Sequence, residues 1–301
     1  MATTLTSLDQ TKIEMAIQAA LKNALIPINA FSIGVSAEGM NQDDVIKVPV
    51  LTDATSQSKT LGTAITVNGT VTGVSVTLDT PVQAGFEMVE GKVNPSQAQA
   101  YTEGLAAGAV YSVCKGIVDA ALGLLTAANY GNTAADKLVV PYADFGQGDL
   151  GNLLTLAEVK KLGRQRSLIL NSGYAGALIG ESSLGLILAS LGDQALKTAV
   201  LPPLLGMTSY MYSGMPTNSE NLGGAVIDKT AIAVAVSPIN NLLSSGDADV
   251  INQSLITDPD SGITVGYRMV GDGDAGKYKV LISAMYGVAK IQNAAIRIVT
   301  A

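Results

Sequence analysis

One glycine- and aspartate-rich run near the C-terminus has spacing similar to that of a phosphate-binding loop. The run Gly271-Asp-Gly-Asp-Ala-Gly-Lys-Tyr278 fits GxGxxG and comes within one residue of GxxxxGK[ST]. A phosphate loop follows a strand, precedes a helix and ends in a Ser or Thr that binds magnesium. Here a tyrosine takes that last position, and the residues after it alternate in polarity as in a strand. We therefore interpret the run as the turn of a β-hairpin.

The same run also begins like a calcium loop, with aspartates at Asp272 and Asp274. The glutamate that closes such a loop at its twelfth position is missing, because Ser283 stands there. Three further aspartates lie in turn-forming segments and are expected to be surface turn residues: Asp228, Asp258 and Asp260. The sequence therefore predicts no metal site.

The residue types needed for most catalytic chemistry are absent. The chain of 301 residues has no histidine and no tryptophan, and its single cysteine is Cys114. Without histidine, Ser-His-Asp and Cys-His triads and histidine-ligated zinc, haem or iron sites are excluded. One cysteine cannot form an internal disulfide, and the apolar neighbours of Cys114 indicate a core position. We expect no enzyme activity and no cofactor.

Charged residues make up only 14% of the chain, and the net charge is -7. A share so far below the usual value of about 25% suggests that much of the surface is buried against other chains. The net charge argues against a protein that wraps nucleic acid, which needs a basic face. One local basic cluster, interpreted as a solvated helix end, comprises Lys160, Lys161, Arg164 and Arg166.

The sequence contains no recognisable export signal or membrane span. Residues 1–22 are polar and include Asp9 and Glu14, without the apolar core of a signal peptide. The most apolar region, 174–205, is interrupted by charged residues and by Pro202-Pro203, so it lacks the roughly 20 apolar residues of a spanning helix. We expect a soluble protein made in the cytoplasm.

The N-terminal third is predicted to hold an arm followed by strands. Residues 1–35 form the expected arm, with a short amphipathic helix that ends before Pro27. Residues 45–51 are typical of a strand that Pro49 confines to an edge or bulge. The polar segment 52–60 is expected to be a projecting loop, and Asn68-Gly69 to turn a hairpin into the strand at 74–78. Such a two-stranded ribbon is marginally stable alone and needs a partner.

A long helix over residues 95–129 is the clearest predicted element. Asn94 is its expected N-cap, Pro95 occupies the first helical position and Gly131 ends it. Apolar residues then recur every four positions and are expected to face the core: Tyr101, Leu105, Ala109, Val113, Ile117, Ala121 and Leu125.

The second half of the chain is predicted to mix short helices and strands. A capping box at Thr155–Glu158 predicts a helix that ends at Gly163, and Asn171-Ser172 is expected to cap another helix after a strand at 167–170. Residues 180–223 are expected to be irregular. The remaining predicted elements are strands at 225–227, 231–236 and 294–299 and a hairpin of 263–269 with 278–284.

This order of elements resembles the Hong Kong 97-type capsid fold of tailed-bacteriophage major capsid proteins. The shared features are an N-terminal arm, an extended β-ribbon, a long "spine" helix, a mixed middle domain and a returning C-terminal hairpin. Local segments also look like phage coat proteins: Val74-Ser-Val-Thr-Leu-Asp79 before a strand at Phe86, Ser167-Leu-Ile-Leu-Asn171 followed by Tyr174, and Tyr286-Gly-Val288 leading to Ala295-Ile-Arg297. The resemblance covers nearly the whole chain.

The resemblance implies an α+β fold with named parts. Residues 1–35 would be the arm and 36–93 the extended loop with its flanking strands. Residues 94–145 and 258–301 would form the peripheral domain, and 146–257 the axial domain. Hypothetical contacts between subunits fall on the loop, at Asp53, Gln57, Lys59, Asn68 and Gly69.

The function implied is that of a structural subunit in the icosahedral virion capsid of a tailed phage. Subunits would form pentamers and hexamers in the host cytoplasm, possible partners being scaffold, portal and decoration proteins. Double-stranded DNA would be enclosed without specific binding, and no membrane is involved. Some family members form a lysine–asparagine cross-link, and Lys59 and Asn293 could take those roles. The alternatives are the shell protein of an encapsulin-type nanocompartment, or a bacterial surface-layer or filament protein.

Overall fold

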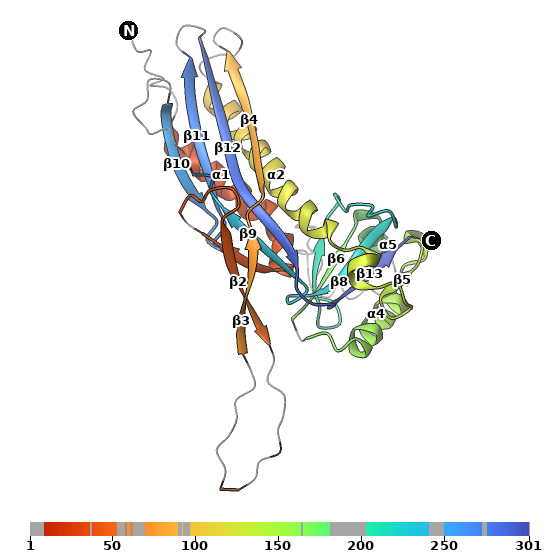
Figure 1. Ribbon diagram of the computed structural model, residues 1–301. Coiled ribbons are helices and arrows are strands. Elements are labelled where there is room, and N and C mark those ends of the chain that lie inside the picture. Colours follow the sequence, from red (N-terminus) through yellow and green to blue (C-terminus); the bar gives the residue numbers. More distant parts are fainter. Residues whose placement is uncertain are drawn as a thin grey trace.

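The computed structural model describes residues 9–36, 38–52, 58, 61–62, 70–89, 92, 97–163, 165–180, 203–240, 250–272 and 276–300. They form two sheets with helices packed on them, and a two-stranded ribbon that projects from the body (Figure 1). The mixture of helices and strands is the α+β class that the sequence predicts.

The larger sheet is built around the long C-terminal strand β12 (Lys277–Lys290). On one side of it lie β11 (Thr264–Asp272) and then β10 (Val250–Thr257), both antiparallel to their neighbours. On its other side β4 (Thr80–Val89) pairs with Lys277–Tyr286 of β12. β9 (Ile232–Ser237) pairs with Met285–Lys290 on the side of β12 that carries β11, because Met285 and Tyr286 also pair with β4 on the opposite side. The short β1 (Ser32–Val35) runs parallel to β9. The predicted C-terminal hairpin is confirmed, whereas β10 was not predicted.

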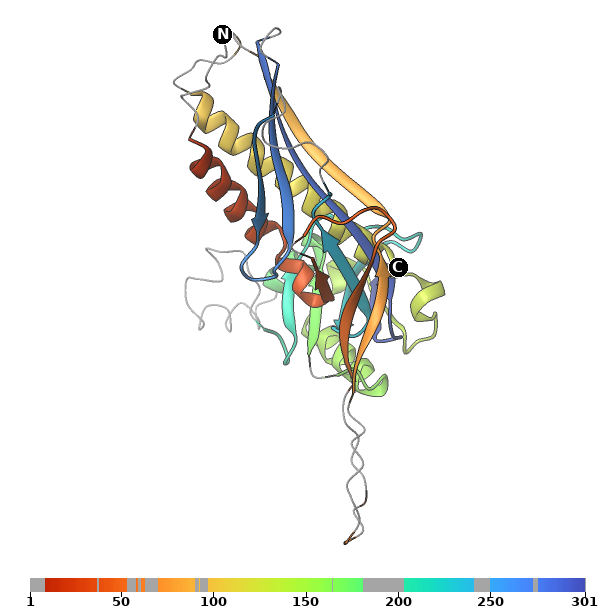
Figure 2. The same ribbon diagram turned by 60° about the vertical axis from the view of Figure 1, so that its left-hand side comes forward.

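Two helices cover one face of this sheet (Figure 2). α1 (Gln10–Ala24) is capped by the Asp9 carboxylate, and it buries Ile13, Ile17 and Leu21 completely in the core that it shares with the sheet and α2. The short amphipathic helix predicted within residues 1–35 is therefore confirmed. An apolar stripe at a spacing of four needs a packing partner, and α1 finds it within its own chain.

The long helix α2 (Ala98–Gly123) packs on β12 and β4 without a break, as predicted, and buries Cys114. At 26 residues it is about 39 Å long, shorter than expected. It starts after Gln97, and the predicted cap Asn94 and Pro95 lie outside the described residues. It ends early because the Leu124 N–H bonds to the Ala121 carbonyl in a tightened last turn, and Thr126 then caps the one-turn helix α3 (Ala127–Tyr130).

By length and composition α2 could also cross a membrane, a possibility that the sequence reading overlooked at this position. Half of its most apolar window is buried inside the protein, as in the core helix of a soluble protein, so this is weak evidence for a span.

The smaller sheet has five strands in the order β5 (Lys137–Val139), β13 (Ala295–Val299), β8 (Leu222–Asp228), β6 (Arg166–Leu170) and β7 (Thr208–Met211). The helices α4 (Gln147–Val159) and α5 (Ser172–Gly180) pack around a core shared with this sheet. The 3-10 turns η1 (Ile26–Ala30) and η2 (Tyr142–Asp144) complete the described elements. The strand β7 lies in a region predicted to be irregular.

The helix predicted to start at Thr155 starts eight residues earlier. The Asp149 carboxylate accepts the Gly146 N–H at 3.1 Å and so secures the first turn. The Thr155 hydroxyl instead donates to the Gly151 carbonyl within the helix. The helix ends at Val159, before the left-handed residue Lys161, so the predicted C-cap at Gly163 is wrong. The predicted start of the next helix is confirmed, since the Asn171 side chain accepts the Gly173 N–H.

The sheets cross the expected domain boundaries. β9 and β10 fall within 146–257 yet pair in the sheet of β11 and β12, and β5 and β13 join the sheet of β6 to β8. The division into peripheral and axial domains therefore stays a proposal.

Candidate assembly surfaces

The ribbon consists of β2 (Val45–Thr52) paired antiparallel with β3 (Thr70–Thr77). The two strands are connected through residues 53–69, and the predicted turn at Asn68-Gly69 lies outside the described residues. All five predicted contact residues lie outside the described residues: Asp53, Gln57, Lys59, Asn68 and Gly69.

The base of the ribbon packs on its own chain. Val48, Val76 and Leu78 are buried in a cluster with Ala233, Ala235 and Met285 of the larger sheet. A Cβ at Gly287 of β12 would overlap the Thr77 carbonyl, so only glycine permits this close approach. The base of the ribbon thus has an internal partner, which the sequence reading did not foresee.

Beyond its base the ribbon exposes apolar side chains. Val71 is 67% exposed, and Leu61, in the connection between the strands, is 90% exposed. The ribbon points away from the body in both views (Figures 1 and 2). Exposed apolar side chains on a projecting element are typical of a surface that contacts another chain.

A second apolar surface lies on the outer side of α2. Tyr101, Leu105 and Tyr111 are 46–51% exposed, and a Cβ at Gly104 or Gly108 would meet nothing within 4 Å. The prediction that Tyr101 and Leu105 face the core is therefore wrong. A repeat of four residues advances about 400° around a helix, so the stripe drifts by about 40° per step, from solvent at Tyr101 to core by Val113.

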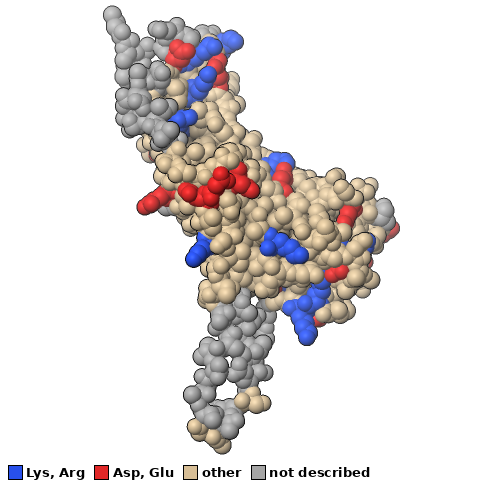
Figure 3. Space-filling view, in the orientation of Figure 1, with Lys and Arg blue, Asp and Glu red and all other residues tan. Residues whose placement is uncertain are grey.

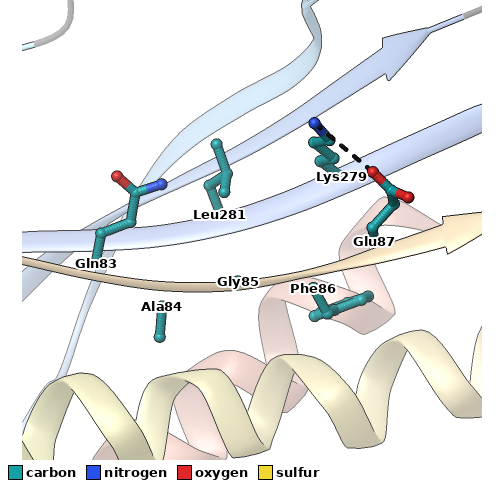
Figure 4. A pocket seen from close by; sticks show the side chains of 7 residues that line it. All are labelled: Gln83, Ala84, Gly85, Phe86, Glu87, Lys279 and Leu281. Atoms are coloured by element: carbon teal, nitrogen blue, oxygen red, sulfur yellow. Dashed lines mark ion pairs between the residues drawn. The ribbon is translucent and has the colours of Figure 1, made fainter.

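A shallow groove lies on the face of the larger sheet that points away from the helices. Figure 4 shows Ala84 and Phe86 pointing toward α2, and Gln83, Glu87, Lys279 and Leu281 pointing to the other side. The floor of the groove is Gly85, where a Cβ would overlap the Val280 carbonyl and approach the Leu281 Cδ2 atom to 2.8 Å. The Glu87 carboxylate pairs with Lys277 and Lys279 at 3.3 and 3.6 Å.

Part of the predicted solvated basic cluster is buried in ion pairs. The Lys160 ammonium lies 2.8 Å from the Asp136 carboxylate, and both side chains are about nine-tenths buried. Arg166 is also largely buried and pairs with Glu158 at 2.7 Å. The solvated interpretation is therefore wrong for Lys160 and Arg166, because α4 ends against β13 and not in solvent.

Asn293, which the resemblance cast in a cross-link, accepts a hydrogen bond from Lys160 of its own chain at 3.2 Å. Burial raises the pKa of the neighbouring Asp136, but hydrogen bonds from Lys160 and Thr133 outweigh it and lower that pKa to about 2. The other residue proposed for the cross-link, Lys59, lies outside the described residues.

The turn aspartates are less exposed than expected. Asp228 and Asp258 are buried, and their carboxylates accept hydrogen bonds from the N–H groups of Thr230 and Ser261. Asp260 forms an exposed ion pair with Lys22. Across the part of the chain that the structure describes, no three His, Cys, Asp or Glu side chains come together as a metal site would need.

The surface carries few charges of either sign. Figure 3 shows scattered Lys, Arg, Asp and Glu side chains separated by wide uncharged areas, without a basic face in this view. One arginine is withdrawn from the surface, since Arg297 is fully buried and pairs with the partly exposed Glu220.

No protein-family profile matches the sequence, and no curated protein matches it either. Solved structures do match the fold. The capsid of Ralstonia phage GP4 aligns with a TM-score of 0.54 and 10% identity, over 89% of this chain and 86% of that chain. The capsid structure of the Cyanophage P-SCSP1u aligns with a TM-score of 0.50 and 13% identity, over 90% and 86%. The chain therefore has the Hong Kong 97-type capsid fold.

Proposed function

We propose that this chain is the major capsid protein of a tailed bacteriophage, a structural subunit that assembles with copies of itself into an icosahedral shell. The observation that carries the proposal is the fold, which aligns with capsid subunits over about nine-tenths of the chain. The composition supports it, because a chain without histidine and with 14% charged residues suits packing more than catalysis.

The exposed surfaces support self-association through unlike patches. The ribbon and the outer side of α2 carry different sets of exposed apolar side chains, so contact between them would be heterologous. Heterologous contacts form rings, such as the pentamers and hexamers of a shell, when the rotation between neighbouring subunits closes. We propose that the ribbon reaches over a neighbouring subunit, with the predicted contact residues at 53–69 in that interface.

The shell would enclose double-stranded DNA without gripping it, since the net charge of -7 opposes phosphate binding. Its place would be the virion, after assembly in the bacterial cytoplasm, with scaffold, portal and decoration proteins as possible further partners. An encapsulin-type compartment would share the fold, but the matched structures described above are phage capsids. A surface-layer or filament protein is disfavoured by the same match.

Negative-stain microscopy and sedimentation of the purified protein, over a range of salt concentrations, test the proposal. Closed shells, or rings of five and six subunits, are the expected result. A compact monomer under every condition, including with added scaffold and portal proteins from its own gene neighbourhood, would refute it.

A further inference from the structure

The strand β10 has an unusual edge for a monomer. Its sequence, Val-Ile-Asn-Gln-Ser-Leu-Ile-Thr, contains no charged residue, proline or glycine. Among the described strands it pairs only with β11, so no described strand occupies its other edge. Natural proteins commonly protect such edges with lysine or proline inside the strand, and β10 has neither.

Side chains of β10 also lack partners. Leu255 is 49% exposed, and the Gln253 Oε1 and Ser254 Oγ atoms are buried without a hydrogen bond. Contacts with α1 occur near the ends of the strand, where Gln10 bonds the Asn252 side chain and Gln18 bonds the Thr257 carbonyl. The exposed Leu255 is thus the side chain in the middle of β10 that a further strand would cover.

The opposite edge of the same sheet is complementary. At the end where β12 begins, the strand order is β4-β12-β11-β10, and within the described residues β4 pairs only with β12. The groove at Gly85 lies along β4, on the face that carries Gln83. Leu255 pairs across the strands with Gly266, Gly266 with Ser283, and Ser283 with Gln83. Residues that pair directly point to the same side of a sheet, so Leu255 lies on the face that carries Gln83.

Strand directions allow the two edges to join. Each neighbouring pair from β4 to β10 is antiparallel, so β4 and β10 run in opposite directions. A second copy in the same orientation would therefore place its β10 antiparallel to β4. The strands have similar lengths, 10 residues in β4 and 8 in β10.

We infer that β10 of one copy pairs with β4 of a second copy, continuing the sheet, with Leu255 seated over Gly85 between Gln83 and Glu87. The inference rests on the proposed self-assembly and adds a strand-to-strand contact distinct from the ribbon. Because the edges are different surfaces of one chain, the contact is heterologous and can repeat around a ring.

Mixed single-cysteine variants test the pairing. Gln83→Cys and Leu255→Cys proteins are co-assembled and treated with a short bismaleimide, which tolerates a shift in register. The only natural thiol, Cys114, is buried. A cross-linked dimer is expected in the mixture and not in either variant alone. Mixing Gln83→Cys with Val159→Cys, an exposed position on α4, is the matched control.

Hydrogen exchange of the wild-type protein gives a second readout that needs no variant. Slower exchange in both β4 and β10 upon assembly is expected. Shells that assemble without cross-linking and without added protection in these strands would overturn the inference and leave the proposed function standing. Cross-linking of Gln83→Cys to Val71→Cys instead would assign the β4 edge to the ribbon and overturn it. Failure of the wild-type protein to associate would overturn both.

Discussion

Replacing Ile17 by alanine should strongly destabilise the unassembled subunit. Ile17 is fully buried in the core that α1 shares with α2 and the sheet. Truncating a buried isoleucine removes apolar contacts and leaves a cavity, at a cost of about 2–5 kcal/mol. That cost is expected only if α1 belongs to the folded monomer, and not to an arm that becomes ordered in a shell.

Met15→Ala on the same helix is the matched control. Met15 is 55% exposed, so its truncation should change the free energy of unfolding by no more than about 0.5 kcal/mol. Both variants are compared with the wild type by urea denaturation, followed by far-ultraviolet circular dichroism under conditions that prevent assembly. Equal, small effects of the two substitutions would refute the packing of α1 on the core.

Four further predictions concern acid stability, the ribbon and DNA. Asp136 has a folded pKa of about 2, below its ordinary value of 3.8, so its carboxylate stabilises the fold above pH 4 and this contribution is lost as the pH falls through 2. In the Asp136→Asn variant the melting temperature should therefore fall less between pH 5 and pH 2 than in the wild type. A melting temperature that falls equally steeply with pH in both proteins would contradict this prediction. Gly287→Ala should lower the melting temperature by several degrees, because the added Cβ would overlap the Thr77 carbonyl. The control Gly148→Ala should not lower it, because the space around the added Cβ is open. Equal melting temperatures of the two variants would count against the packing of the ribbon base. Deleting residues 53–60 should leave a monomer with near-native circular dichroism that forms no stable shell, so unchanged shells would rule out the proposed ribbon contact. The free subunit should bind duplex DNA more weakly than micromolar in filter binding, and tight, salt-sensitive binding would contradict simple enclosure.

Local patterns predicted much of the secondary structure. The amphipathic repeat of α1, the alternation in β11 and β12 and the cap at Asn171 all depend on neighbours within a few residues, and each is present. The capping box at Thr155 failed, because its residues also fit the middle of a helix and the stronger start signal was the Asp149 carboxylate.

The candidate assembly surfaces were predicted less well. The named contact residues in the ribbon lie outside the described residues, and the groove at Gly85 was not foreseen. Gly85 was not among the residues singled out from the sequence. Its role becomes visible once β4 is paired with β12, where the Leu281 side chain lies against it.

Residue types and short-range periodicity are local properties, so the sequence alone shows which residue types are absent and predicts many, though not all, of the strands and helices. Which faces and edges stay exposed follows from how distant segments pack together. Tyr101 is exposed and Val113 buried on one helix, and Lys160 is held by Asn293, 133 residues away. Exposure and ion pairing depend on contacts between distant segments, so the surfaces available to a second subunit emerge only when those segments pack.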